Sequence, residues 1–189
     1  MGGEEVEVRV ACFMLAMIAG PACGQTVTLA DLEGVVVQAS VSYQNHARWN
    51  GKEIQNHSRT HWTITLRRDG AGRSEWSTTV QNAGRSYTSA PISGSFTVAQ
   101  ARQAASLGSG HALWVFDNGV LTLLRTYRAG GFKLSIAFTQ NSGHLACTIR
   151  AVNARETGAG NTRRDSPFGG EYEIISATPT GSTCNVTKG

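Results

Sequence analysis

Long hydrophobic runs are missing from this sequence, and acidic residues are scarce. The longest apolar stretch runs from Val10 to Ala19, about half the length that a transmembrane helix needs. Asp and Glu together number 13 in 189 residues, and no two of them form a pair that can be assigned to one cleft. These absences point away from a chain that crosses a membrane as a helix and from catalysis by paired carboxylates.

Motifs of the common enzyme classes are also absent. No Gly-x-Ser-x-Gly nucleophile elbow occurs, and "GSG" at Gly108 to Gly110 lacks the rest of a dinucleotide-binding fingerprint. We find no cofactor motif. A hydrolase-type enzyme would have to assemble its site from scattered residues, which one sequence does not reveal. We therefore expect a protein that is not an enzyme, and keep the hydrolase as an alternative.

The apolar stretch near the N-terminus is typical of a secretory signal peptide. Val10 to Ala19 is followed by the breaker pair "GP" and by "ACG" before Gln25, which places small residues before a cleavage point. We expect a signal peptide over 1–24, a single domain over 25–189, and a periplasmic or secreted protein. Cys23 leaves a lipoprotein anchor as an alternative to simple cleavage.

Cysteine usage agrees with export. Of the four cysteines, Cys12 and Cys23 lie in the predicted signal peptide, so the mature chain keeps Cys147 and Cys184. Two cysteines in an oxidising compartment predict one disulfide, which stabilises the fold by roughly 4 kcal/mol in the chain-entropy model. The alternative, a reactive thiol, needs an activating His or Arg and a reducing compartment.

Basic charge exceeds acidic charge without forming a stripe. The mature chain keeps 16 Lys and Arg against 10 Asp and Glu, and its only adjacent basic pairs are Arg67-Arg68 and Arg163-Arg164. Scattered charge of this kind does not predict a nucleic-acid partner. An anionic envelope surface of lipid headgroups or polysaccharide remains a possible partner.

The first strand pair is the most strongly specified feature. "GVVVQASVSYQNHARW" alternates apolar and polar residues with the period of a strand, and Asn50-Gly51 is a strong signal for a two-residue hairpin turn. With that turn, the numbers of paired residues add up to 101, so that Val37 faces Ile64 and Ala39 faces Trp62. The apolar faces of the two strands agree, which supports the register.

Alternating runs joined by turns continue to the end of the chain. Pro91 predicts an edge or broken strand, residues 97–108 a short helix that ends at Gly108, and residues 153–170 a polar loop. Asn118-Gly119 predicts a second hairpin, and "EYEIISA" and "TCNVT" two closing strands. Some nine or ten strands predict an all-β fold: an antiparallel up-and-down β-barrel, or a β-sandwich as the alternative.

The histidines raise the question of a metal site. His57 and His61 have the spacing of a helical zinc pair, but in a strand their backbones are about 13 Å apart, too far to share an ion bound at about 2 Å. His46 and His57 are the only two imidazoles that the register brings together, while Glu53 lies opposite Arg48. We expect no metal site.

The second hairpin carries the best candidate binding residues. Trp114 faces Leu123, and both faces of the hairpin are apolar, which predicts that both are covered. Arg125 and Tyr127 lie on the same face of the hairpin as Trp114, at the end of its apolar stripe. Trp62 points inward from the first hairpin. Apolar walls with a few polar anchors suit a small amphipathic or anionic ligand. The alternative is that Arg125 and Tyr127 reach solvent at the strand end.

The C-terminal part of the chain resembles a family of uncharacterised small exported bacterial β-rich proteins with a C-terminal cysteine pair. The resemblance lies in "LWVFDNGVLTLLRTYRAGG", the two later cysteines and "NARETGAG". The resemblance covers residues 110–187. It implies a signal peptide, a disulfide and a β-rich domain, and no catalytic residue. Binding of a small ligand is the function we expect first, and an envelope interaction or inhibitor protein that uses the loop 153–170 is the second alternative.

Overall fold

The computed structural model describes residues 26–99, 112–127, 130–155 and 170–188. These residues form one short 3₁₀ turn, η1 (Ala30–Leu32), and ten strands. In chain order the strands are β1 (Val35–Trp49), β2 (Lys52–Leu66), β3 (Ala71–Asn82), β4 (Arg85–Thr88), β5 (Ile92–Thr97), β6 (Ala112–Asp117), β7 (Val120–Tyr127), β8 (Gly130–Asn141), β9 (His144–Arg155) and β10 (Tyr172–Lys188). The predicted all-β antiparallel class is therefore confirmed.

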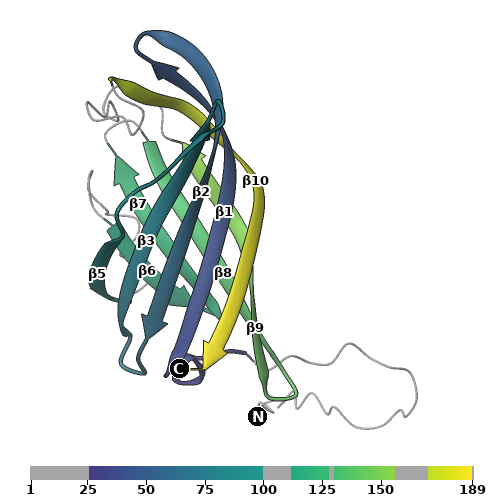
Figure 1. Cartoon of the computed structure of the whole chain (residues 1–189). Helices are drawn as coiled ribbons and strands as arrows, with labels where there is room; N and C mark the ends of the chain where they lie inside the picture. Colours follow the sequence, from purple (N-terminus) through teal and green to yellow (C-terminus); the bar gives the residue numbers. More distant parts are fainter. Residues whose placement is uncertain (1–25, 100–111, 128–129, 156–169, 189) are drawn as a thin grey trace, which may run out of the picture.

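The strands form two sheets that face each other (Figure 1). One sheet has the order β10-β1-β2-β3-β4, with β5 also paired to β3, and the other has the order β6-β7-β8-β9. We call them the front sheet and the back sheet. The strand order is that of an up-and-down meander, but among the described strands the hydrogen-bond ladder is divided into two sheets. The predicted barrel is therefore not closed.

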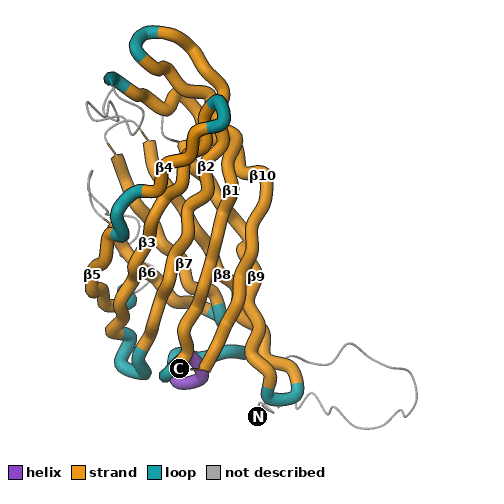
Figure 2. Tube along the Cα trace, viewed as in Figure 1, coloured by secondary structure: helices purple, strands orange, loops and turns teal. Residues whose placement is uncertain are grey.

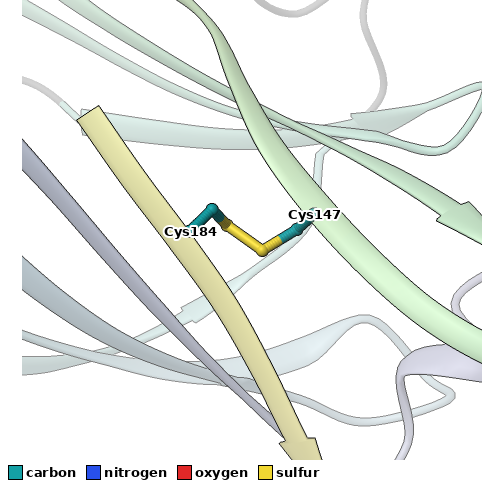
Figure 3. The surroundings of a disulfide bond; sticks show 2 residues. All are labelled: Cys147 and Cys184. Carbon is teal, nitrogen blue, oxygen red and sulfur yellow. A yellow bond between two sulfur atoms is a disulfide. The ribbon is translucent and has the colours of Figure 1, made fainter. Parts of the chain in front are cut away.

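Two seams join the edges of the sheets. At one seam β9 lies beside β10, and a disulfide between Cys147 and Cys184 links them (Figure 3). The Cα atoms of the two cysteines are 5.6 Å apart. At the other seam the chain after β5 meets β6, where the backbone N–H of Ala99 donates to the carbonyl of Trp114 at 2.7 Å. The predicted disulfide is present and lies where the ladder is interrupted.

Both predicted hairpin registers are confirmed. Trp49 pairs with Lys52 and Val37 with Ile64, so every β1–β2 pair keeps the predicted sum. At the β1–β2 turn, Asn50 and Gly51 have φ values of 48° and 78°, as a type I′ turn requires. The second Asn-Gly turn has the same conformation and pairs Trp114 with Leu123.

The end of the chain differs from the prediction. The two predicted closing strands are one strand, β10, which pairs with the whole of β1. Two register shifts, opposite Ser42/Tyr43 and opposite His46/Ala47, each insert an extra residue into β10. Such bulges allow a strand to continue through residues that usually interrupt one, here Pro179 and Gly181.

Two further predictions fall largely outside the described residues. Thr97, the expected start of the short helix, ends β5 instead, and residues 100–111 are not described. β9 continues through Arg155, so the polar loop expected over 153–170 does not start at Asn153, and residues 156–169 are not described. Pro91 separates β4 from β5, so the expected interruption of the strand is confirmed.

The core lies between the two sheets. Alternate residues of β1 and β2 point into it, among them Val37, Val41 and Ile64, and they meet Leu121, Leu134 and Ile136 of the back sheet. The segment before β1 closes one end of the core, where η1 lies beside the start of β1 (Figure 2). Val27 and Leu32 of this segment are buried.

Candidate functional site

Aromatic rings and one guanidinium form a layer between the sheets. On the front sheet Trp62 of β2 pairs with Trp76 of β3. On the back sheet Arg125 of β7 pairs with Phe132 of β8. Trp62 stacks on Phe132 with ring centroids 5.9 Å apart, and the guanidinium carbon of Arg125 lies 5.9 Å from the centroid of the Trp76 ring. Each pair on one sheet therefore faces the pair on the other.

A second aromatic contact lies next to this layer. Trp114 of β6 stacks on Phe96 of β5 with ring centroids 4.7 Å apart. Phe96 pairs with Gly72 of β3, where an added Cβ atom would lie 2.5 Å from the Phe96 ring. The glycine therefore gives this ring the space to pack against β3.

The structure brings three of the four predicted binding residues into the interior. Trp62 and Trp114 are buried, and Arg125 is half-buried beside Trp76. Tyr127 ends β7, and its side chain lies outside the described part of the structure. The guanidinium of Arg125 lies over an indole, an arrangement that stabilises a cation by about 0.5–2 kcal/mol depending on its exposure.

Sequence reasoning missed Trp76, Phe96 and Phe132 as partners of this group. The signal for Trp76 is its position opposite Trp62, which follows from the β2–β3 register. That register depends on the longer turn after Leu66, in which the backbone N–H of Arg67 donates to the carbonyl of Ala71. Contacts between different sheets, such as Trp62 with Phe132, have no local sequence signal.

A buried polar cluster lies farther along the inner face of the front sheet. The amide nitrogen of Asn45 donates to Asn56 Oδ1 at 2.9 Å and to Ser58 Oγ at 3.0 Å. The amide nitrogen of Asn56 donates to the Tyr172 hydroxyl at 2.7 Å. Asn45 and Asn56 are 1% and 2% exposed, and no described residue donates a hydrogen bond to Asn45 Oδ1. The cluster joins β1, β2 and the start of β10.

His46, His57 and His61 lie on the outer face of the front sheet. His46 Nε2 lies 3.1 Å from Glu53 Oε2, so His46 contacts the carboxylate of Glu53, which was expected opposite Arg48. His61 Nδ1 lies 2.8 Å from Ser40 Oγ, but no carboxylate of the described residues is hydrogen-bonded to His61. Nor do these residues contain a group of three or more His, Cys, Asp or Glu side chains that could hold a metal ion.

Two surface depressions are formed by the front sheet. One, of about 560 Å³, lies over β2, β3 and β5 and includes Arg67 and Arg73. Arg67 forms an ion pair with Asp69; this bond and the backbone N–H of Ala71 hold the pKa of Asp69 below its ordinary value. The other, of about 410 Å³, lies over β10, β1 and β2. Neither depression is lined by Trp62, Trp114 or Arg125.

Comparison with known proteins places this chain in no family. No family model matches it, and neither the curated proteins nor the solved structures contain a match. Among the described residues, no helix has the length and apolar character needed to cross a membrane. The disulfide is consistent with an extracellular environment.

Proposed function

We propose that this chain is an exported, non-catalytic binding protein for a small amphipathic anion, and that it works in the periplasm or outside the cell. The ligand's acidic group would be held by Arg125, and its apolar part would lie against the rings around it. The resemblance to small exported β-rich proteins and the predicted signal peptide favour the same location. A disulfide in the mature region also suits an oxidising compartment.

The observation that carries the proposal is the placement of Arg125. Its side chain belongs to the inward face of β7, beside Trp76 and opposite Phe132 on the neighbouring strand. Apolar walls with one oriented cation are the usual composition of a site for an amphipathic acid. A guanidinium also forms two parallel hydrogen bonds with a carboxylate, which favours acids over alcohols of the same length.

Titration with a matched acid and alcohol tests this proposal. We expect dodecanoate to change the fluorescence of the oxidised protein, because Trp62, Trp76 and Trp114 all line the interior, and dodecanol to bind at least tenfold more weakly. Arg125→Gln should weaken dodecanoate binding roughly tenfold to a hundredfold, the loss of one charged hydrogen-bonding group. Isothermal titration calorimetry gives the affinities.

Lys133→Gln is the matched control. Lys133 follows Phe132 on β8 but is exposed, so its removal lowers the net charge equally and should leave dodecanoate affinity unchanged. Equal affinities in the Arg125→Gln variant and the unaltered protein would contradict the proposal. Native mass spectrometry of protein purified from its own envelope should show a retained acid; detection of the bare polypeptide alone, under conditions that preserve known carrier complexes, counts against it.

A further inference from the structure

The depression over β10, β1 and β2 is lined by six polar side chains and by Cys184, and none of these residues is acidic. We call it the outer groove. Gln38 and Ser40 of β1 form its floor, Arg59 and His61 of β2 one wall, and Thr183 and Asn185 of β10 the other. The floor residues alternate with Val37, Ala39 and Val41, which are buried in the core. The groove is therefore on the opposite face of the sheet from the interior site.

The floor holds a hydrogen bond whose direction can change. Ser40 is 5% exposed although it belongs to the outer face, and its hydroxyl oxygen lies 2.8 Å from His61 Nδ1. The serine hydroxyl donates when Nδ1 carries no proton and accepts when it does. In the second arrangement the hydroxyl hydrogen of Ser40 is available to a ligand in the groove.

Arg59 reaches across the floor to the opposite wall. Its guanidinium lies 3.5 Å from Thr183 Oγ1, at the long limit of a hydrogen bond, which leaves other N–H groups of the fork for a ligand. Within the described residues, no carboxylate lies within ion-pair distance of Arg59. A cation on the wall of a donor-lined groove attracts anions.

We infer that the outer groove binds a phosphate group, either as the free ion or as a phosphomonoester. Its donors come from a floor and two opposite walls, which suits a tetrahedral oxyanion better than a planar carboxylate. Guanidinium, hydroxyl and amide groups are the usual protein partners of phosphate. A volume of about 410 Å³ exceeds that of the bare ion, so the groove has room for the organic part of a phosphomonoester.

Titration of isotope-labelled protein with inorganic phosphate and with glycerol 3-phosphate tests the inference. We expect saturable shifts in the NMR signals of Arg59, Ser40 and Thr183, with Arg59→Gln weakening the affinity at least tenfold and Ser40→Ala about threefold or more. Tighter binding of the ester than of the ion identifies a phosphorylated molecule as the ligand. Equal or weaker binding of the ester identifies the free ion.

Arg85→Gln is the control for non-specific attraction. Arg85 is an exposed arginine of β4 outside the groove, so its substitution should leave the affinity unchanged. The inference is overturned if the groove signals do not shift at 50 mM phosphate, or if the Arg59 and Arg85 variants lose affinity equally. Arg125→Gln should bind phosphate with unchanged affinity. The test of the outer groove is therefore independent of the test of the interior site.

Discussion

Asn45, Asn56 and Tyr172 place amide and phenol groups inside the front sheet, where most neighbouring side chains are apolar. Each hydrogen bond in such surroundings contributes only about 1 kcal/mol, but a buried group that loses its partner costs about 1–3 kcal/mol. The cluster joins β1 and β2 to β10, strands that are far apart in the sequence. A shift of β10 along β1 would leave these buried groups without partners, so the cluster stabilises the observed register of β10.

Removal of one hydroxyl tests this role. Tyr172→Phe leaves the buried amide nitrogen of Asn56 without the hydroxyl that accepts its hydrogen bond, and we expect a loss of about 1–3 kcal/mol in the free energy of unfolding. Tyr87→Phe is the control, because Tyr87 is 42% exposed and should change stability by less than about 0.5 kcal/mol. Urea unfolding of both variants measures the difference; equal values would contradict the assigned role of the cluster.

At the scale of the strands, a register could be predicted where a short turn with a known conformation joins the two strands. The two Asn-Gly turns fix their hairpin registers through the conformation of two residues, so β1–β2 and β6–β7 could be derived from the sequence. β10 could not, because Pro179 and Gly181 usually interrupt a strand. Pairing with all of β1, with two bulges, overrides that local preference.

In the candidate site, too, the features predicted correctly are those determined within one hairpin. Trp62, Trp114 and Arg125 were predicted from alternation within their own hairpins, which fixes the face on which each side chain lies. Their partners Trp76, Phe96 and Phe132 come from other hairpins or from the opposite sheet. Such contacts depend on how the sheets pack, for which the sequence of one hairpin holds no signal.

Gly72 tests the packing of β5 against β3. In Gly72→Ala the added Cβ would lie 2.5 Å from the Phe96 ring and 2.7 Å from the carbonyl oxygen of Thr65, so the ring has to move. We expect a loss of about 1–3 kcal/mol in unfolding free energy and a changed near-ultraviolet circular dichroism spectrum, because Phe96 stacks on Trp114.

Gly94→Ala is the matched control for that substitution. Gly94 lies on β5 two residues from Phe96, and no atom lies within 4 Å of its added Cβ. We expect unchanged or slightly higher stability, since alanine reduces the freedom of the unfolded chain. If both variants unfold at the same urea concentration, the contact between Gly72 and Phe96 does not limit the packing.

For the whole molecule, the two seams determine how the sheets are held together. Backbone ladders join the strands within each sheet, whereas β9 and β10 are linked by a disulfide that closes a loop with a sequence separation of 37 residues. Among the described residues, the seam at Ala99 is an isolated bridge to Val115, in which the backbone N–H of Ala99 donates to the carbonyl of Trp114. We therefore expect the disulfide to contribute more than backbone hydrogen bonds to holding the edges of the two sheets together.

Replacing both cysteines by serine tests this expectation. For a loop of this size the chain-entropy model gives a loss of about 4 kcal/mol in unfolding free energy, and the reduced unaltered protein should unfold at the same urea concentration as the double variant. Hydrogen exchange should increase more in β9 and β10 than in β2, which lies inside the front sheet. A loss below about 1 kcal/mol, with even exchange, would mean that side-chain packing holds this seam.

The pairing of β1 with both β2 and β10 also affects the order of folding. The β1–β2 hairpin needs only its own turn, whereas the shortest link between β1 and β10 joins Trp49 to Tyr172. Contacts so distant in the sequence form slowly, because a long chain segment has to be closed first. Until β10 pairs with it, the fifteen-residue edge of β1 can pair with strands of other chains. We therefore expect misassembly and aggregation to occur mainly before β10 has paired.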